Sequence, residues 1–167
     1  MTRMDLSADC GRCAALCCMA FAFDKGRQFA RDKAAGEPCS NLGRDGCRIY
    51  ADRAGEGYGG CVQYHCQGAG QRVTQDLFQG ADWRDDPSLR QPMAQAFAVV
   101  QGAHAVLALL RQAEGLPLSQ ADRDRLAGLE TAIVEAGASP GAVAARTAEA
   151  RGFLRSLQRY VERPAAG

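Results

Sequence analysis

The residues of this chain with the most distinctive chemistry are its eight cysteines, all of which lie before residue 67. Thiolates bind zinc, iron and copper ions, and they also act as nucleophiles. In a reducing compartment disulfides are rare, so a dense group of thiols indicates metal ligands or catalytic groups rather than small buried side chains. The predicted metal ligands are Cys10, Cys13, Cys17, Cys18, Cys39, Cys47, Cys61 and Cys66.

The first four cysteines are closely spaced, in the pattern Cys10-x2-Cys13-x3-Cys17-Cys18. We expect a helix over about residues 9–22, which would place Cys10, Cys13 and Cys17 on one face and Cys18 at its edge. Three thiolates in one stripe, with a fourth beside them, can hold one metal ion or bridge two.

The other four cysteines follow irregular sequence. Cys39 and Cys47 each come directly after a turn, Cys61 and Cys66 are separated by four residues, and His65 precedes Cys66. The first seventy residues contain few large apolar side chains, and a segment of this size needs additional cross-links to be stable. We therefore expect metal binding to contribute to the folding of this part of the chain.

Composition and charge argue against several classes of protein. Hydrophobic residues make up 47% and charged residues 23% of the chain, as in ordinary globular proteins. The net charge is +1, from 20 basic and 19 acidic side chains, so we expect no nucleic-acid partner. The absence of a long apolar run, and of an apolar stretch at the start, predicts a cytoplasmic protein with no membrane segment.

The pattern becomes helical after Gly70. A short helix is expected over 71–78. Three longer helices are then expected over 86–115, 119–137 and 139–164, because capping residues and helix breakers mark their ends. The predicted fold is mainly α, with an irregular, metal-stapled domain over 1–70 packed on an antiparallel bundle of about three helices over 71–167.

The two histidines are the candidate catalytic residues. His65 is either a metal ligand or a surface residue beside Cys66. His104 lies on the apolar stripe of the expected long helix. It is either a core residue, or it points at the thiols and serves as a metal ligand or proton carrier.

The cysteine-bearing segment contains a set of distinctive motifs, namely Cys10-x2-Cys13-x3-Cys17-Cys18, Pro38-Cys39-x-Asn41-Leu42, Asp45-Gly46-Cys47-x-Ile49-Tyr50-x2-Arg53, Cys61 and Cys66. In these residues it resembles the YkgJ-type cysteine cluster family, which is named for zinc or iron chelation by a CxxCxxCC motif. The family usually has two residues between its second and third cysteines, whereas this chain has three, and Ala54 stands where the family often has proline. The resemblance implies a zinc- or iron-binding role.

A second resemblance covers the segment 60–71 and the pattern Phe78-x-Gly80-x2-Trp83-Arg84-x2-Pro87. These residues are similar to the cysteine-rich leader of some bacterial pentapeptide-repeat proteins. This sequence has no pentapeptide repeats. Neither resemblance implies an established reaction.

The sequence leaves the metal and its role open. Zinc is the first expectation for four-thiolate sites in turn-rich segments, and the alternatives are a [4Fe–4S] cluster, mononuclear or di-iron sites, or copper. The predicted function is a cytosolic metal-binding protein with two metal ions or one polynuclear centre. One alternative is a redox or hydrolytic metalloenzyme acting on a small molecule or peptide at the junction of the halves. The other is a zinc-stabilised module that binds a partner protein.

Overall fold

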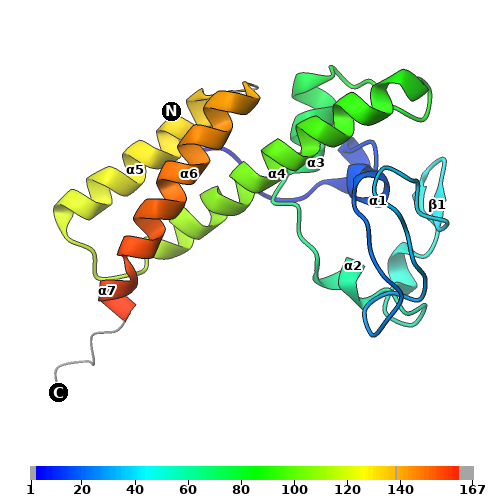
Figure 1. The fold of residues 1–167 in the computed structure, drawn as a ribbon, viewed down its shortest axis with the longest axis horizontal. Coiled ribbons are helices and arrows are strands. Elements are labelled where there is room, and N and C mark those ends of the chain that lie inside the picture. Colours follow the sequence, from blue (N-terminus) through cyan, green and yellow to red (C-terminus); the bar gives the residue numbers. More distant parts are fainter. Residues whose placement is uncertain (1–2, 138, 162–167) are drawn as a thin grey trace. The chain divides into compact units, whose positions relative to one another are not determined.

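The structure of the chain, a computed structural model, describes residues 3–137 and 139–161 (Figure 1). The described part is mainly α, as the sequence predicts, and its only sheet is a two-stranded antiparallel pair in which Leu42 is opposite Cys47. The chain divides into two compact units. One is Ser7–Ala98, and the other combines the described residues of Met1–Leu6 and Val99–Gly167. The division expected after residue 70 falls inside the first of these units.

The Ser7–Ala98 unit is built from short elements. It contains all eight cysteines, and glycine-rich turns connect most of its elements. Its elements are η1 (Cys10–Arg12), α1 (Leu16–Ala20), β1 (Leu42–Gly43), β2 (Gly46–Cys47), η2 (Tyr50–Asp52), α2 (Gly59–Gln63), α3 (Ala69–Gln71), the π-helix η3 (Arg72–Leu77), η4 (Pro87–Leu89) and the first turns of α4 (Arg90–Ala113).

The continuous helix expected over residues 9–22 is wrong, because the backbone reverses at Ala15. This residue is in the left-handed region, with φ of 52° and ψ of 41°, so η1 and α1 are separate. The neighbouring backbone groups bond to side chains instead of to a helical ladder. The N–H of Ala14 donates to Oγ1 of Thr74 at 3.0 Å, and Nε1 of Trp83 donates to the carbonyl of Ala14 at 2.7 Å. The cysteines therefore do not form the single helical stripe that was expected.

The second unit is helical. It contains the remainder of α4, α5 (Gln120–Glu135), α6 (Pro140–Ser156) and the short α7 (Gln158–Val161), and α5 and α6 lie side by side (Figure 1). Its core includes Leu107, Leu129 and Phe153. This confirms the expectation of about three main helices.

The expected helix boundaries are largely confirmed. The side chain of Ser119 accepts a hydrogen bond from the N–H of Asp122 at the start of α5, and Asp86 caps η4 in the same way. Gly137, with φ of 59°, follows the end of α5. The expected stop at Pro164 lies outside the described residues.

The helical stretch Pro87–Ala113 is the one described segment that is long and apolar enough, by length and composition, to cross a membrane. Its mean hydropathy is 1.6 over the most apolar window, of which 44% is buried within the structure. A core helix meets the same criteria, and Met93, Leu107 and Leu110 of this helix are fully buried.

Candidate metal centre

All eight cysteines are free thiols in this structure. Cys10 is exposed and the other seven are partly buried. No group of three or more His, Cys, Asp or Glu side chains within the described ranges is arranged closely enough to hold a metal ion. The site is therefore described by which thiols influence one another and by which charged and polar groups surround them.

Cys17 has several other thiols within electrostatic range. Its own pKa is strongly raised, first by the hydrogen bond between its thiol and that of Cys18 and then by burial. Burial raises the pKa of Cys10, Cys13 and Cys61, and repulsion from Cys17 raises each of these further. Cys17 is thus common to the surroundings of four other cysteines.

Cys66, Cys39 and Cys47 also lie within electrostatic range of other thiols. Repulsion from Cys66 contributes to the raised pKa of Cys10 and of Cys13, after burial and Cys17. Repulsion from Cys39 and Cys47 contributes in the same way to the raised pKa of Cys61. By these electrostatic interactions we divide the thiols into two overlapping groups that share Cys17. One contains Cys10, Cys13 and Cys66, and the other contains Cys18, Cys39, Cys47 and Cys61.

Cys13 lies at the backbone reversal that ends the expected helix. Its pKa is raised to about 11, mainly by burial, and hydrogen bonds from the backbone N–H groups of Leu16 and Ala15 oppose this rise. Two N–H groups directed at one sulfur stabilise its thiolate form. The reversal at Ala15 therefore gives Cys13 donors that a continuous helix would have used internally.

The segment that carries Cys10 and Cys13 is fastened to α3 and η3 by side-chain amides. Gln71 donates from Nε2 to the carbonyl of Ser7 at 2.7 Å and accepts from the N–H of Asp9 at 2.9 Å. Gln75 donates from Nε2 to the carbonyl of Arg12 at 2.8 Å. The wide π-helical turn of η3 thus presents side chains to the cysteine segment, and such turns are frequent at functional sites.

Lys33 places a positive charge among the second group of thiols. Its Nζ donates to the carbonyl oxygens of Met19 at 3.0 Å, Ala34 at 3.1 Å and Phe21. Burial lowers the pKa of Lys33, while the negative charges of Cys39 and Cys18 raise it. The ammonium is thus fixed in position and able to offset thiolate charge.

Arg53 is the second cation near the thiols. Its guanidinium donates from Nε to the carbonyl of Tyr50 at 2.8 Å and from a terminal nitrogen to the carbonyl of Cys61 at 3.3 Å. It also lies over the ring of Tyr50, with its central carbon 3.9 Å from the ring centroid. Its charge opposes the rise in pKa that burial causes at Cys10 and Cys61.

Tyr64 contributes a polar atom that lacks a hydrogen-bond partner. Its hydroxyl oxygen is buried and forms no hydrogen bond within the described part of the chain. Its ring packs edge-on against Phe21, with centroids 5.2 Å apart. Burial raises the pKa of Tyr64, and the charges of Cys17, Cys66 and Cys13 raise it further, so the hydroxyl lies near the first group of thiols.

The two histidines have different surroundings. Nδ1 of His65 accepts a hydrogen bond from the N–H of Gln67 at 3.0 Å. His104 is 4% exposed, on the part of α4 that belongs to the helical unit. The hydrogen bond of His65 occupies one of its two ring nitrogens.

Several residues of the site carried no signal in the sequence. Lys33 and Thr74 are single polar residues outside any motif, and Tyr64 lies in the segment 60–71 without a role assigned to it. All three become part of the site through contacts with other segments. Trp83 belongs to the pattern of the second resemblance, which gave it no role in the site. Arg90 lies over its ring, 5.4 Å from the centroid, and its indole N–H donates to the carbonyl of Ala14, next to the left-handed residue Ala15.

Comparisons with known proteins give one informative similarity. The chain is 40% identical over 117 residues to the uncharacterized protein YybG of Bacillus subtilis (strain 168). The matched region is 70% of this chain and 42% of YybG, so the chain spans less than half of that relative. No family model matches the chain, and no solved structure matches it.

Proposed function

We propose that the Ser7–Ala98 unit is a thiolate metal centre, which binds two metal ions or one polynuclear centre through up to eight cysteines. The observation that carries this proposal is the position of Cys17, which neighbours Cys10, Cys13, Cys18 and Cys61. Thiolates within electrostatic range of one another repel, and a bound cation would offset that repulsion.

The donor set and its surroundings fit such a metal. The N–H groups directed at Cys13 and the cations of Lys33 and Arg53 would stabilise thiolates once protons are displaced. The hydroxyl of Tyr64 would gain an acceptor when nearby thiols become thiolates. These groups suit the charged, metal-bound state better than a cluster of neutral thiols.

Zinc is the metal we propose first, because two four-thiolate sites would use all eight cysteines and leave each ion closed. The role would then be structural, or the storage or delivery of metal in the cytoplasm. Iron, as a [4Fe–4S] cluster or as mononuclear or di-iron sites, is the alternative metal.

A metalloenzyme is the second candidate function, favoured by a cavity that opens beside Cys39. A metal ion held partly by Cys39 would be accessible to a small molecule from this cavity. An enzyme would keep a coordination position open, whereas a closed four-thiolate site would not.

The deciding experiment is metal analysis together with an absorption spectrum, on the full chain purified without air or added metal. About two zinc ions per chain and no colour would support closed thiolate sites. Iron with matching sulfide would support a cluster, and iron without sulfide would favour the enzyme. A chain that retains no metal and takes up none when offered would overturn the proposal.

The matched variants are Cys13→Ser and, as a control, Ala35→Ser at an exposed position of the same unit. Cys13→Ser should lower the metal content and unfold the Ser7–Ala98 unit, while the helical signal of α5 and α6 persists. Ala35→Ser should change neither. Unchanged metal content in Cys13→Ser would remove Cys13 from the ligand set.

A further inference from the structure

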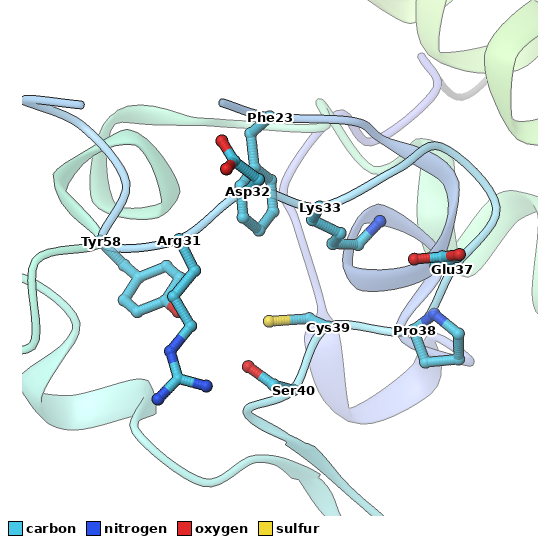
Figure 2. Close-up of a pocket in the computed structure, with 9 residues that line it drawn as sticks. All are labelled: Phe23, Arg31, Asp32, Lys33, Glu37, Pro38, Cys39, Ser40 and Tyr58. Atoms are coloured by element: carbon cyan, nitrogen blue, oxygen red, sulfur yellow. The ribbon is translucent and has the colours of Figure 1, made fainter. Parts of the chain in front are cut away.

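A cavity of about 240 Å³ lies within the Ser7–Ala98 unit and is not used by the proposed metal ligands, apart from Cys39 (Figure 2). The volume equals the share of about eight water molecules in the liquid, so it accommodates a small organic molecule. The lining residues that matter for the argument are Phe23, Arg31, Lys33, Cys39, Ser40 and Tyr58.

Arg31 contributes a positively charged side chain to the lining of the cavity. Its guanidinium forms no hydrogen bond or ion pair with any residue that the structure describes. In Figure 2 the guanidinium lies below Tyr58, and Sγ of Cys39 and the hydroxyl of Ser40 point towards it from across the cavity. A guanidinium presents parallel N–H donors that match the two oxygens of a carboxylate, so this corner is suited to a carboxylate ligand.

The other charged groups of the lining leave this corner positive. The carboxylate of Asp32 accepts a hydrogen bond from the N–H of Lys25 at 2.6 Å, and Glu37 lies at the opposite end of the view from Arg31 (Figure 2). The ammonium of Lys33 is held by three backbone carbonyls and points towards Glu37 in the same view, so Arg31 is the charged group at this corner. An anion is therefore favoured over a cation near Arg31.

An aromatic wall completes the cavity. The ring of Phe23 stacks on Phe29 with centroids 4.3 Å apart, and Tyr58 packs edge-on against Phe23 at 6.2 Å. Tyr58 is only 5% exposed, which fixes this wall in the core of the unit. Such a surface buries hydrocarbon, so an occupant with both a carboxylate and methylene groups uses the site more fully than a bare oxyanion.

We propose that this cavity binds a small organic carboxylate of about eight non-hydrogen atoms. Its carboxylate pairs with Arg31 and Ser40, and its hydrocarbon part lies against Phe23 and Tyr58. The occupant also contacts Sγ of Cys39, which places it beside the proposed metal centre. The binding itself depends on Arg31 and the aromatic wall, so it does not require the metal assignment to be correct.

The test uses succinate as the probe and the uncharged succinamide as its matched analogue, titrated by calorimetry into the full chain as purified. Succinate should bind and succinamide should bind at least tenfold more weakly. The variant Arg31→Gln should reduce succinate affinity at least tenfold. Arg27→Gln, an exposed arginine outside the cavity lining, should leave the affinity unchanged.

Three results would overturn the inference. They are equal binding of succinate and succinamide, unchanged affinity in Arg31→Gln, and binding of inorganic phosphate as tight as that of succinate. Metal content and circular dichroism of each variant are measured alongside. Loss of succinate binding at unchanged metal content and helicity supports the cavity, whereas loss of metal with succinate binding intact bears on the metal proposal alone.

Discussion

The sulfur of Cys13 lies directly against the backbone of Gly70. A side-chain carbon built on Gly70 would be 2.5 Å from Sγ of Cys13 and 3.4 Å from its Cβ, and contacts under 3.0 Å are not sustained without movement. Gly70 belongs to α3, so its role differs from that of the turn glycine Gly68, which has φ of 77°. It provides the space in which the Cys13 thiol lies.

Gly70→Ala should therefore lower the metal content. Alanine favours a helix over glycine by about 1 kcal/mol, but displacing Cys13 costs more, in the range of about 1–3 kcal/mol for overpacking. We expect a net loss of stability of the Ser7–Ala98 unit and substoichiometric metal, measured by metal analysis and thermal unfolding.

Gly128→Ala is the control for that substitution. Gly128 lies in α5, and a Cβ there meets nothing within 4 Å. It should stabilise the chain by up to about 1 kcal/mol and leave metal binding unchanged. Full metal content in Gly70→Ala would show that Cys13 does not need this position to bind metal.

Tyr64→Phe should have opposite effects on the metal-free and the metal-loaded chain. In the metal-free chain the substitution removes a buried hydroxyl without a partner, which should stabilise the unit by about 1 kcal/mol or leave it unchanged. In a metal-loaded chain we expect the hydroxyl to donate to a nearby thiolate, and loss of a hydrogen bond to a charged group costs about 1.5–3 kcal/mol. Metal affinity, measured by competition with a chelator, should fall roughly tenfold or more. Equal affinities of variant and wild type would contradict this role for Tyr64.

Local patterns in the sequence were sufficient for the helical unit and insufficient for the thiol site. Ser119 and Gly137 mark the ends of α5 because capping depends on neighbours a few residues away. The reversal at Ala15 depends instead on Thr74 and Trp83, which bond to the adjacent Ala14 from 60 and 69 residues along the chain. Helical periodicity carries no information about such contacts, so the expected stripe of cysteines did not form.

The candidate metal ligands could be predicted because they are all cysteines. The other residues around them could not be predicted from the sequence. Cysteine density alone identified the candidate thiols. Lys33 belongs to no motif, the resemblance over 60–71 assigns Tyr64 no role, and a lysine or tyrosine at these positions is compatible with many exposed loops. Their roles follow from the carbonyl oxygens around the Lys33 ammonium and from burial of the Tyr64 hydroxyl.

His65→Ala should leave metal stoichiometry unchanged. Because Nδ1 of His65 accepts the N–H of Gln67, the neutral ring carries its proton on Nε2. Metal binding through Nε2 would require the other tautomer and would break this hydrogen bond. Metal analysis of the purified variant is the measurement. A loss of one metal ion per chain would instead make His65 a ligand.

The helical unit should lose stability in acid because of Asp122. The hydroxyl of Tyr160, the hydroxyl of Ser119 and the guanidinium of Arg159 all bond to this carboxylate, and they lower its pKa from 3.8 to about 2. A carboxyl whose pKa is lower in the folded state stabilises the fold above its unfolded pKa. That contribution is lost as the pH falls through the folded value. The loss should therefore occur between pH 3.8 and about 2.

Asp122→Asn tests this contribution, with Asp124→Asn removing the same charge two residues further along α5. Chemical unfolding followed by helical circular dichroism should show Asp122→Asn less stable than wild type at pH 5, with the difference shrinking towards pH 2. Asp124 is bonded only to the side-chain amide of Gln120 in the described part of the chain, so its substitution should produce a smaller change. If the curves of wild type and Asp122→Asn stay parallel from pH 5 to pH 2, the carboxylate of Asp122 does not stabilise α5 and α7 through these three partners.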